Sequence, residues 1–257
     1  MVFNVASPFD NLSPADLQRQ VMDFASSENP KTWDKTILDQ YVNCIIPRSI
    51  FFRNTAANAH VLDLGAGDGG LATLKSWPLV TRRDIKMYAV SLEKGAQFSL
   101  YEDFELGNFE EALPNFNAML FDAIMCSHFI EHISDPIRAL QFISTRLKPG
   151  GSVYLEWPHP MSKNMPSLTK LHDIGVNVMT TNFYDDLTHK EAWTMDHIAS
   201  GLESKGLRIS ACGRVWFDFI ADELMAHGKA ANNAIDLTYA VWYKFAWAQF
   251  VVASKPL

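Results

Sequence analysis

A short apolar run that breaks into a cluster of glycines is the feature that most constrains this chain. Residues 61–64 are apolar except for Asp63, and four glycines follow between positions 65 and 70. Leu71 and Leu74 then return at a spacing that is typical of a helix. This order predicts a buried strand, a tight turn and a helix, the arrangement with which ligand-binding α/β sheets begin.

Asp63 indicates what kind of ligand the turn binds. Glycines allow backbone amides to come close to a ligand, but the match of Gly65, Gly67 and Gly70 to the pattern G-x-G-x-x-G is by itself a weak signal. A carboxylate two residues before Gly65 would repel a pyrophosphate, whereas it attracts cationic and hydroxyl groups. The charge therefore favours a sulfonium amino acid over a dinucleotide such as NAD.

The stretch Asp63-Leu64-Gly65-Ala66-Gly67 resembles the first motif of class I S-adenosylmethionine (SAM)-dependent methyltransferases. Residues 121–126, 131–136 and 147–151 are similar to later motifs of that family, in the same order, so the resemblance covers roughly residues 55–160. It implies an α/β fold, a doubly wound, Rossmann-like sheet of seven mostly parallel strands in the order 3-2-1-4-5-7-6 with the final strand antiparallel. It also implies SAM as the cofactor and methyl transfer as the activity.

We expect one α/β unit with helical additions, because 257 residues are enough for a single domain with a large core. The expected parts are an N-terminal helical cap at 1–54 and a methyltransferase domain at 55–257, with a helical insertion at about 216–246 before the last strand. In the resembled family such N-terminal helices often cover the cofactor, and plain packing on the sheet is the alternative. Trp33 and Tyr41 are the side chains that distinguish the two.

Charge and hydrophobicity limit the partners of the chain. A formal net charge of −7 disfavours nucleic acid, whose binding draws on clustered Lys and Arg. Residues 1–4 do not resemble a secretory leader, and no uncharged apolar run approaches the ~20 residues that span a bilayer. We therefore expect a cytoplasmic protein that acts on a small molecule, without a nucleic-acid or membrane partner. The sequence does not indicate the oligomeric state.

The resemblance places the cofactor residues at the carboxyl ends of successive strands. After the second expected strand, at 85–90, Ser91 stands where the family usually has an acid. Glu93 is therefore the candidate for the ribose hydroxyls, unless it is only a solvated residue at a helix start. Asn108 is the candidate for the adenine edge, with a Gly-Asn turn as the alternative. The predicted cofactor-binding residues are Asp63, Gly65, Ala66, Gly67, Glu93, Asn108, Phe109 and Ser127.

Histidines are the candidates for a catalytic base. Methyl transfer from a sulfonium mainly requires alignment of nucleophile, methyl and sulfur, and a hydroxyl acceptor must also lose its proton. Imidazole titrates near neutral pH, which suits that task. We predict His189, or else His128, as the base, and the Glu131-His132 pair as support for its loop, a role that the resemblance implies. The histidines expected at the carboxyl edge of the sheet are His128, His132, His159 and His189.

One run has the spacing of metal ligands. His128, Glu131 and His132 spell H-x-x-E-H, the motif of inverzincin proteases, in which positions i, i+3 and i+4 share one face of a helix. A third zinc ligand cannot be identified, which disfavours the protease. The run is also similar to the Glu-x-x-Glu-His of some quinone-pathway methyltransferases, which implies a divalent ion as an alternative, with His128 in place of the first carboxylate. We expect no bound metal.

Two segments bear on the acceptor, which the sequence does not identify. Residues 160–190 are loop-like, and a loop this long is usually functional. Their core, Asp185 to His189, resembles a stretch of some sugar-associated methyltransferases and favours a hydroxyl of a sugar or glycan precursor. That acceptor is our first expectation, and the alternative, favoured by the large apolar side chains of 216–246, is O-methylation of a quinone or aromatic natural product. An NAD-dependent oxidoreductase and a non-catalytic SAM-binding partner are remote alternatives, which the intact glycine motif and the Asp122 strand disfavour.

Overall fold

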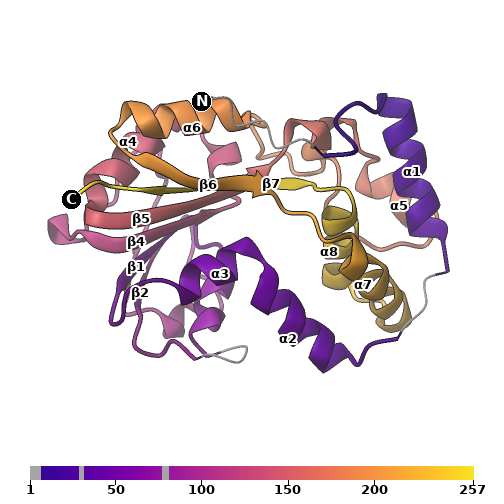
Figure 1. The fold of residues 1–257 in the computed structure, drawn as a ribbon, viewed down its shortest axis with the longest axis horizontal. Helices are drawn as coiled ribbons and strands as arrows, with labels where there is room; N and C mark the ends of the chain where they lie inside the picture. The colour runs from indigo at the N-terminus through magenta and orange to yellow at the C-terminus, as the bar shows by residue number, and fades with distance from the viewer. Residues whose placement is uncertain (1–6, 29–31, 77–80) are drawn as a thin grey trace.

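A central sheet of seven strands organises the molecule (Figure 1). The computed structural model describes residues 7–28, 32–76 and 81–257, so that residues 1–4, on which the leader expectation rests, lie outside the described residues. The order β3-β2-β1-β4-β5-β7-β6, with β7 antiparallel to both of its neighbours, confirms the predicted sheet. The strands are β1 (His60–Leu64), β2 (Lys86–Ser91), β3 (Asp103–Leu106), β4 (Phe121–Ser127), β5 (Leu147–Pro158), β6 (Arg208–Arg214) and β7 (Ala248–Ser254).

β1 lies at the centre of the parallel part of the sheet. It pairs in parallel with β2 on one side and with β4 on the other. Its side chains Val61, Leu62 and Leu64 are completely buried, as expected for a strand that is covered on both faces. Because neighbouring strands run in the same direction, the carboxyl ends of β1, β2, β3 and β4 gather at one edge, where open α/β sheets bind their ligands.

Helices cover both faces of the sheet. On one face, α4 and α6 begin at capping residues of the preferred types, Asp135 and Thr194, each of which accepts a backbone N–H from the first turn. These two helices approach closely, since a Cβ on Gly201 of α6 would lie 2.5 Å from Leu140 Cδ1 of α4. On the other face, α3 and the 3-10 helix η1 contribute buried side chains to a separate apolar cluster. The bounds are α3 (Pro47–Arg53), η1 (Gly70–Lys75), α4 (Pro136–Arg146) and α6 (Met195–Ser204).

The segment after the glycine turn differs from the prediction. The leucine spacing predicts a longer helix, and the structure has the six-residue 3-10 helix η1. Gly69 precedes η1 with φ at +87°, and the N–H of Arg82 donates to the carbonyl of Lys75 at 2.8 Å. The prediction of a regular helix is wrong for Gly70–Lys75, which form the tighter 3-10 turn, and residues 77–80 lie outside the described residues.

A helical lobe lies beside the sheet, beyond the end of β5 (Figure 1). Its helices come from both ends of the chain and share one apolar core, which includes Leu17, Leu38, Ile220 and Val241. The N-terminal helices and the predicted insertion therefore pack into one structure. Within the described ranges, no helix has the length and apolarity needed to cross a bilayer. The helices of this helical lobe are α1 (Pro14–Ser26), α2 (Lys35–Ile45), α5 (Leu168–His172), α7 (Asp218–Ala231) and α8 (Ala234–Lys244).

Asp185 organises the segment between residues 160 and 190. Its carboxylate accepts the backbone N–H groups of Leu168, Thr181 and Asn182 at 2.8–3.1 Å. The segment predicted as loop-like therefore has a defined path, which leads back to the sheet edge, where the N–H of Lys190 donates to the carbonyl of Glu131 at 2.8 Å. Its short helices are η5 (Pro160–Asn164), α5 and η6 (Phe183–Asp185).

Candidate functional site

A pocket of about 800 Å³ opens at the carboxyl edge of the parallel strands. Its wall consists of the segments that follow β1, β2, β3 and β4, together with residues 187–190. The structure thus brings residues from five separate segments to one cavity. Among the residues predicted for the site, those that line the pocket are Gly65, Gly67, Glu93, Asn108, Phe109, His128 and His189.

The glycine turn is held against the end of β2. The N–H groups of Gly65 and Ala66 both donate to the carbonyl of Val90, at 2.9 and 2.8 Å. Gly65 has φ at +86°, and a Cβ at this position would lie 2.5 Å from the ring of Phe129. Glycine is therefore required at position 65 for both conformation and space, and it leaves the backbone exposed to the pocket.

Asp63 lies behind this turn. Its side chain is 1% exposed, and its Oδ2 accepts a hydrogen bond from the hydroxyl of Tyr101 at 2.5 Å. Its Oδ1 has no hydrogen-bond partner among the residues that the structure describes. Burial raises the pKa of Asp63 from its ordinary value of 3.8 to about 7, although the Tyr101 hydrogen bond opposes the shift. A buried carboxylate oxygen without a partner fits a cationic ligand in the neighbouring pocket.

Glu93 and Asn108 lie on the pocket wall with different surroundings. Glu93 is exposed and has no hydrogen-bond or ion-pair partner in the described part of the chain, so its carboxylate is available to a ligand. The Asn108 amide is engaged locally, because its Oδ1 accepts the N–H of Glu110 at 3.0 Å and its Nδ2 donates to Glu111 at 3.1 Å. The turn alternative for Asn108 thus describes its contacts, and the adenine role stays a prediction.

His128 lies between two buried carboxylates at the end of β4. Its φ of +53° is rare for a residue with a Cβ and is typical of strained functional positions. Nε2 lies 3.1 Å from Oε1 of Glu156, and Nδ1 lies 3.3 Å from Oε1 of Glu131. Burial lowers the pKa of His128, but the two carboxylates outweigh burial and raise it to about 10. The ring is therefore a cation at neutral pH and has no site for another proton.

Glu156 connects His128 to the helices. Nη1 of Arg48 donates to its Oε1 at 3.1 Å, and the hydroxyl of Tyr154 donates to its Oε2. Burial raises the pKa of Glu156, but Arg48 and His128 hold it at about 2, so the group stays ionised. Nη2 of Arg48 also donates to the hydroxyl of Tyr239, which ties α3 to α8 and β5. Two cations thus flank one carboxylate at the edge of the pocket.

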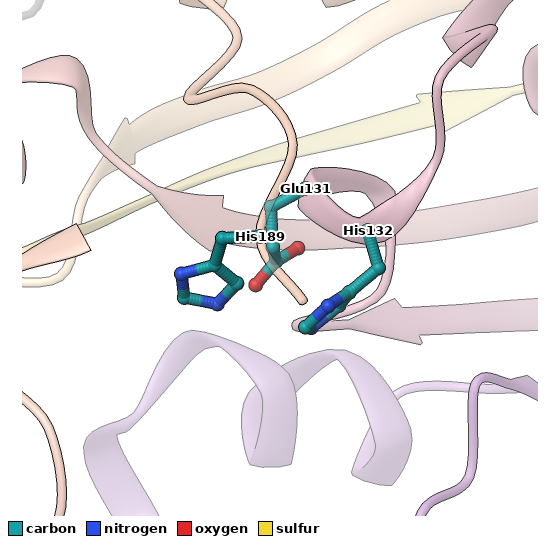
Figure 2. Close-up of side chains that lie close together, drawn as sticks. All are labelled: Glu131, His132 and His189. Carbon is teal, nitrogen blue, oxygen red and sulfur yellow. The ribbon is translucent and has the colours of Figure 1, made fainter. Parts of the chain in front are cut away.

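Glu131, His132 and His189 converge at the pocket wall (Figure 2). One ligand atom from each lies within 4.8 Å of the others, and the Glu131 carboxylate lies between the two imidazole rings. Glu131 is completely buried, and neither of its oxygens accepts a hydrogen bond from a described residue. His132 and His189 line the pocket in front of it, so the cluster faces any molecule bound there.

A family model described as a methyltransferase domain matches residues 39–208, about two thirds of the chain. The chain belongs to this methyltransferase family. The match includes every segment that lines the pocket, and it confirms the resemblance to class I SAM-dependent methyltransferases. Membership in the family also agrees with SAM as the cofactor, and the orphaned Oδ1 of Asp63 beside the glycine turn fits the cationic end of SAM.

Relatives of this methyltransferase include a "Ubiquinone biosynthesis O-methyltransferase" of Xanthomonas axonopodis pv. citri, which is 30% identical over 149 residues, or 54% of this chain and 60% of the relative. The chain thus spans about 60% of the length of that curated relative. Among solved structures, a putative sarcosine dimethylglycine methyltransferase from Galdieria sulphuraria has a TM-score of 0.56 at 14% identity, over 94% of this chain and 98% of the other. A SAM-dependent methyltransferase from Mesorhizobium loti has a TM-score of 0.53 at 13% identity, over 83% and 100%. These two likenesses concern the fold.

Six candidates from the sequence do not line the pocket, and two of them, Asp63 and Ala66, are buried in and beside the glycine turn. Trp33 and Tyr41 pack on each other with ring centroids 5.3 Å apart, and Tyr41 contacts Phe219 of α7, so they connect helices of the helical lobe. His159 caps η5, because its Nδ1 accepts the N–H of Met161 at 3.1 Å. The Oγ of Ser127 is buried without a hydrogen-bond partner among described residues.

Sequence reasoning missed the charged network and part of the wall of the methyltransferase pocket. Arg48 and Glu156 lie 108 positions apart, and the one available signal was an acid inside the apolar strand 152–157. The missed lining residues lie next to motif positions, which was the signal for them. They include Leu92, Phe129, Ile133, Leu187, Thr188 and Lys190.

Proposed function

We propose that this methyltransferase transfers the methyl group of SAM to a hydroxyl of a small aromatic or quinone-type molecule. One observation carries the proposal: a single pocket is lined both by the glycine turn in front of Asp63 and by His132 and His189. A cofactor site and a polar reaction site thus share one cavity. The pocket is also large enough, at about 800 Å³, to belong to the size range of small-molecule sites.

The chain's own residues would hold SAM at the glycine turn. Asp63 would attract the cationic end of the cofactor, Glu93 would bind the ribose hydroxyls, and Phe109 would lie against the adenine. When bound, SAM supplies a methyl group on a positively charged sulfur that leaves as a neutral thioether. The protein then has to align the acceptor with that methyl group and let the acceptor lose its proton.

The proton of the acceptor hydroxyl is lost beside His189 rather than His128. His128 is a cation between Glu131 and Glu156, so it has no lone pair to offer at neutral pH. His189 lines the same pocket, its Nδ1 is bound to the carbonyl of Phe183, and its Nε2 lies 3.9 Å from Oδ2 of Asp186, beyond hydrogen-bond distance. Of the two predicted histidines, we therefore keep His189 for the reaction site and assign His128 to the support of that site.

The acceptor we propose first is aromatic. The curated relatives are named as ubiquinone biosynthesis O-methyltransferases, and apolar side chains such as Leu92, Phe129 and Leu187 line the pocket. A sugar hydroxyl is the second candidate, on the resemblance of residues 185–189. That stretch, however, has local tasks in the fold, because Asp185 holds three backbone amides and Thr188 contacts His132. These contacts give Asp185 and Thr188 structural roles that do not require a sugar acceptor.

The test combines binding with turnover. Calorimetry should detect binding of SAM and of its demethylated product, and the variant Asp63→Ala should bind SAM at least tenfold more weakly. The exposed control Asp173→Ala should leave binding unchanged. Labelled methyl transfer should then be measured to a panel of catechols and hydroquinones and to a panel of free and nucleotide-linked sugars. The proposal fails if neither form of the cofactor binds, and the aromatic assignment fails if only sugars are methylated. A chain that binds SAM but methylates neither panel would favour the non-catalytic alternative.

A further inference from the structure

We infer that Glu131, His132 and His189 form a binding site for one divalent transition-metal ion. The inference rests on the proposed function only for what the ion does, and its binding can be measured without any acceptor. The sequence pointed away from a metal because no third ligand followed the Glu131-His132 pair. The structure supplies that ligand as His189, which residues 186–190 bring to the same wall of the pocket.

Glu131 is the first observation that points to a ligand. Its side chain is completely buried, and neither oxygen accepts a hydrogen bond from any described group. His128 Nδ1 is 3.3 Å from Oε1, so one oxygen has an ion-pair contact and Oε2 has none. Buried carboxylates are normally paired, hydrogen-bonded or bound to a metal, because desolvation disfavours their charge. The carboxylate points between the two imidazole rings (Figure 2).

The two histidines are fixed in the way that metal-binding histidines usually are. His189 Nδ1 lies 2.6 Å from the carbonyl of Phe183, which can only accept, so Nδ1 carries the hydrogen. Thr188 donates its hydroxyl hydrogen to Asp186 at 2.6 Å, so its oxygen accepts from His132 Nδ1 at 2.9 Å. Each ring is therefore oriented through Nδ1, which makes Nε2 the atom that would bind an ion, although Nε2 of His189 also lies 3.9 Å from Oδ2 of Asp186.

The spacing fits one small ion after a minor adjustment. Two ligands at about 2.1 Å from a common ion are at most about 4.2 Å apart, and the three ligand atoms here lie within 4.8 Å of one another. A small rotation of the His132 and His189 rings, neither of which is fully buried, would close the difference. Two imidazoles favour Zn²⁺, Fe²⁺ or Co²⁺ over Mg²⁺, Ca²⁺ and Mn²⁺, which prefer oxygen. Three protein ligands leave a position open toward the pocket that His132 and His189 line.

An ion at this site explains how the acceptor loses its proton. A hydroxyl at the open position would have a lowered pKa, so its proton passes to solvent at the pocket. The oxygen pair then forms the new bond to the methyl carbon, and the electrons of the carbon–sulfur bond stay on the sulfur. His189 in this arrangement is a ligand and Thr188 is a positioning residue. His128, occupied by Glu131 and Glu156, takes no part in binding the ion.

The experiment uses Co²⁺ and full-length protein without a histidine tag, stripped with a chelator and then dialysed. Calorimetry and the visible absorption of Co²⁺ should show one ion per chain. Glu131→Gln and His189→Ala should each weaken the binding of Co²⁺ more than about 100-fold, because residues that only support metal ligands already contribute about 10–100-fold to metal affinity. Thr188→Val should weaken it about tenfold, and Thr188→Ser should restore it. His197→Ala, an exposed histidine outside the cluster, should bind as the unchanged protein does.

Circular dichroism should confirm that each variant is folded. Because Thr188 is exposed, Thr188→Val and Thr188→Ser should fold as the unchanged protein does. The inference is overturned if the stripped protein binds no Co²⁺, or if Glu131→Gln, His189→Ala and Thr188→Val bind it as tightly as His197→Ala does. SAM binding is measured on the same samples. If the stripped protein binds SAM but not Co²⁺, the metal site is refuted and the proposed function is not. If it binds Co²⁺ but not SAM, the proposed function is refuted and the metal site is not.

Discussion

Asp63, which is buried, and His128, which is partly buried, are ionisable side chains at the ends of neighbouring strands, and their environments have opposite effects on charge. Burial raises the pKa of Asp63 to about 7, which favours its neutral form in the free protein. The carboxylates of Glu131 and Glu156 raise the pKa of His128 to about 10, which favours its charged form. One residue therefore changes charge readily when a cation binds beside it, and the other keeps its charge throughout the neutral range.

The affinity for SAM should depend on pH through Asp63. A cationic ligand binds the ionised carboxylate, so affinity should fall by up to tenfold for each pH unit below about 7 and level off above it. Calorimetric titrations between pH 5.5 and 8.5 measure this. Asp63→Asn should bind SAM weakly, and its affinity should depend less on pH. Groups on SAM itself titrate equally in both experiments, so the difference between the two proteins reports on Asp63. Parallel profiles for the two proteins would contradict the assignment.

The same shift has a defined sign for stability. The pKa of Asp63 is raised in the folded state, so between about pH 4 and pH 7 the folded chain holds a proton that the unfolded chain has lost. The contribution of Asp63 to the free energy of unfolding is therefore greatest below that range, and it declines as the pH rises to about 7. Bound SAM should remove this decline, because it stabilises the ionised form.

Individual residues were predictable where a local pattern marked them. Asp63 and Gly65 stand in a motif whose spacing carries the chemistry; in the structure Gly65 lines the pocket, and Asp63 is buried behind the glycine turn. Arg48 and Glu156 could not be found, because their pairing depends on two distant segments meeting at the sheet edge. His189 was found as a candidate, but its proximity to Glu131 depends on the path of residues 160–190, which no local pattern encodes.

Among the structural elements, residues 160–190 do most to complete the site. The sequence shows no helix or strand period there, and the structure holds the segment through hydrogen bonds to Asp185 instead. Caps were easier to predict, since Asp135 and Thr194 begin α4 and α6 as their positions indicate. The prediction of a regular helix after the glycine turn was wrong, because the spacing of two leucines cannot distinguish an α-helix from a short 3-10 helix.

Asp185→Ala should loosen this segment without abolishing cofactor binding. Three backbone amides lose a charged acceptor, so the free energy of unfolding should fall by on the order of 3 kcal/mol. Methyl transfer should fall at least tenfold, because residues 187–190 form one wall of the pocket. Hydrogen exchange over residues 160–190, thermal melts and SAM calorimetry check this. The exposed Asp173→Ala is the matched control, and equal exchange in the two variants would refute the role of Asp185.

At the scale of the whole molecule, the strand order of the sheet could be predicted from the motifs, whereas the packing of the helical lobe could not be predicted from the sequence. The sequence separates 1–54 from 216–246, and nothing local shows that α1 and α2 pack on α7 and α8. The structure joins them through a core that includes Leu38, Ile220 and Val241. The domain boundary at residue 54 stays a prediction, but its two sides share this apolar core.

Leu38→Ala should therefore destabilise both ends of the chain together. Leu38 is completely buried in the core of the helical lobe, so its truncation should cost about 2–5 kcal/mol. The neighbouring Ile37 is 59% exposed, and Ile37→Ala should cost less than about 0.5 kcal/mol. Hydrogen exchange should rise in α7 and α8 as well as in α2 for Leu38→Ala. Faster exchange confined to α2 would show that the helices are independent.

The shared core of α1, α2, α7 and α8 has a consequence for synthesis on the ribosome. The first two helices leave the exit tunnel with their apolar faces uncovered, and the partners that bury those faces lie roughly 200 residues later. At about 5–20 residues per second this leaves an interval of about 10–40 s. During that time Leu17, Val21 and Leu38 are available to chaperones, so newly made chains should be retained by them until translation is nearly finished.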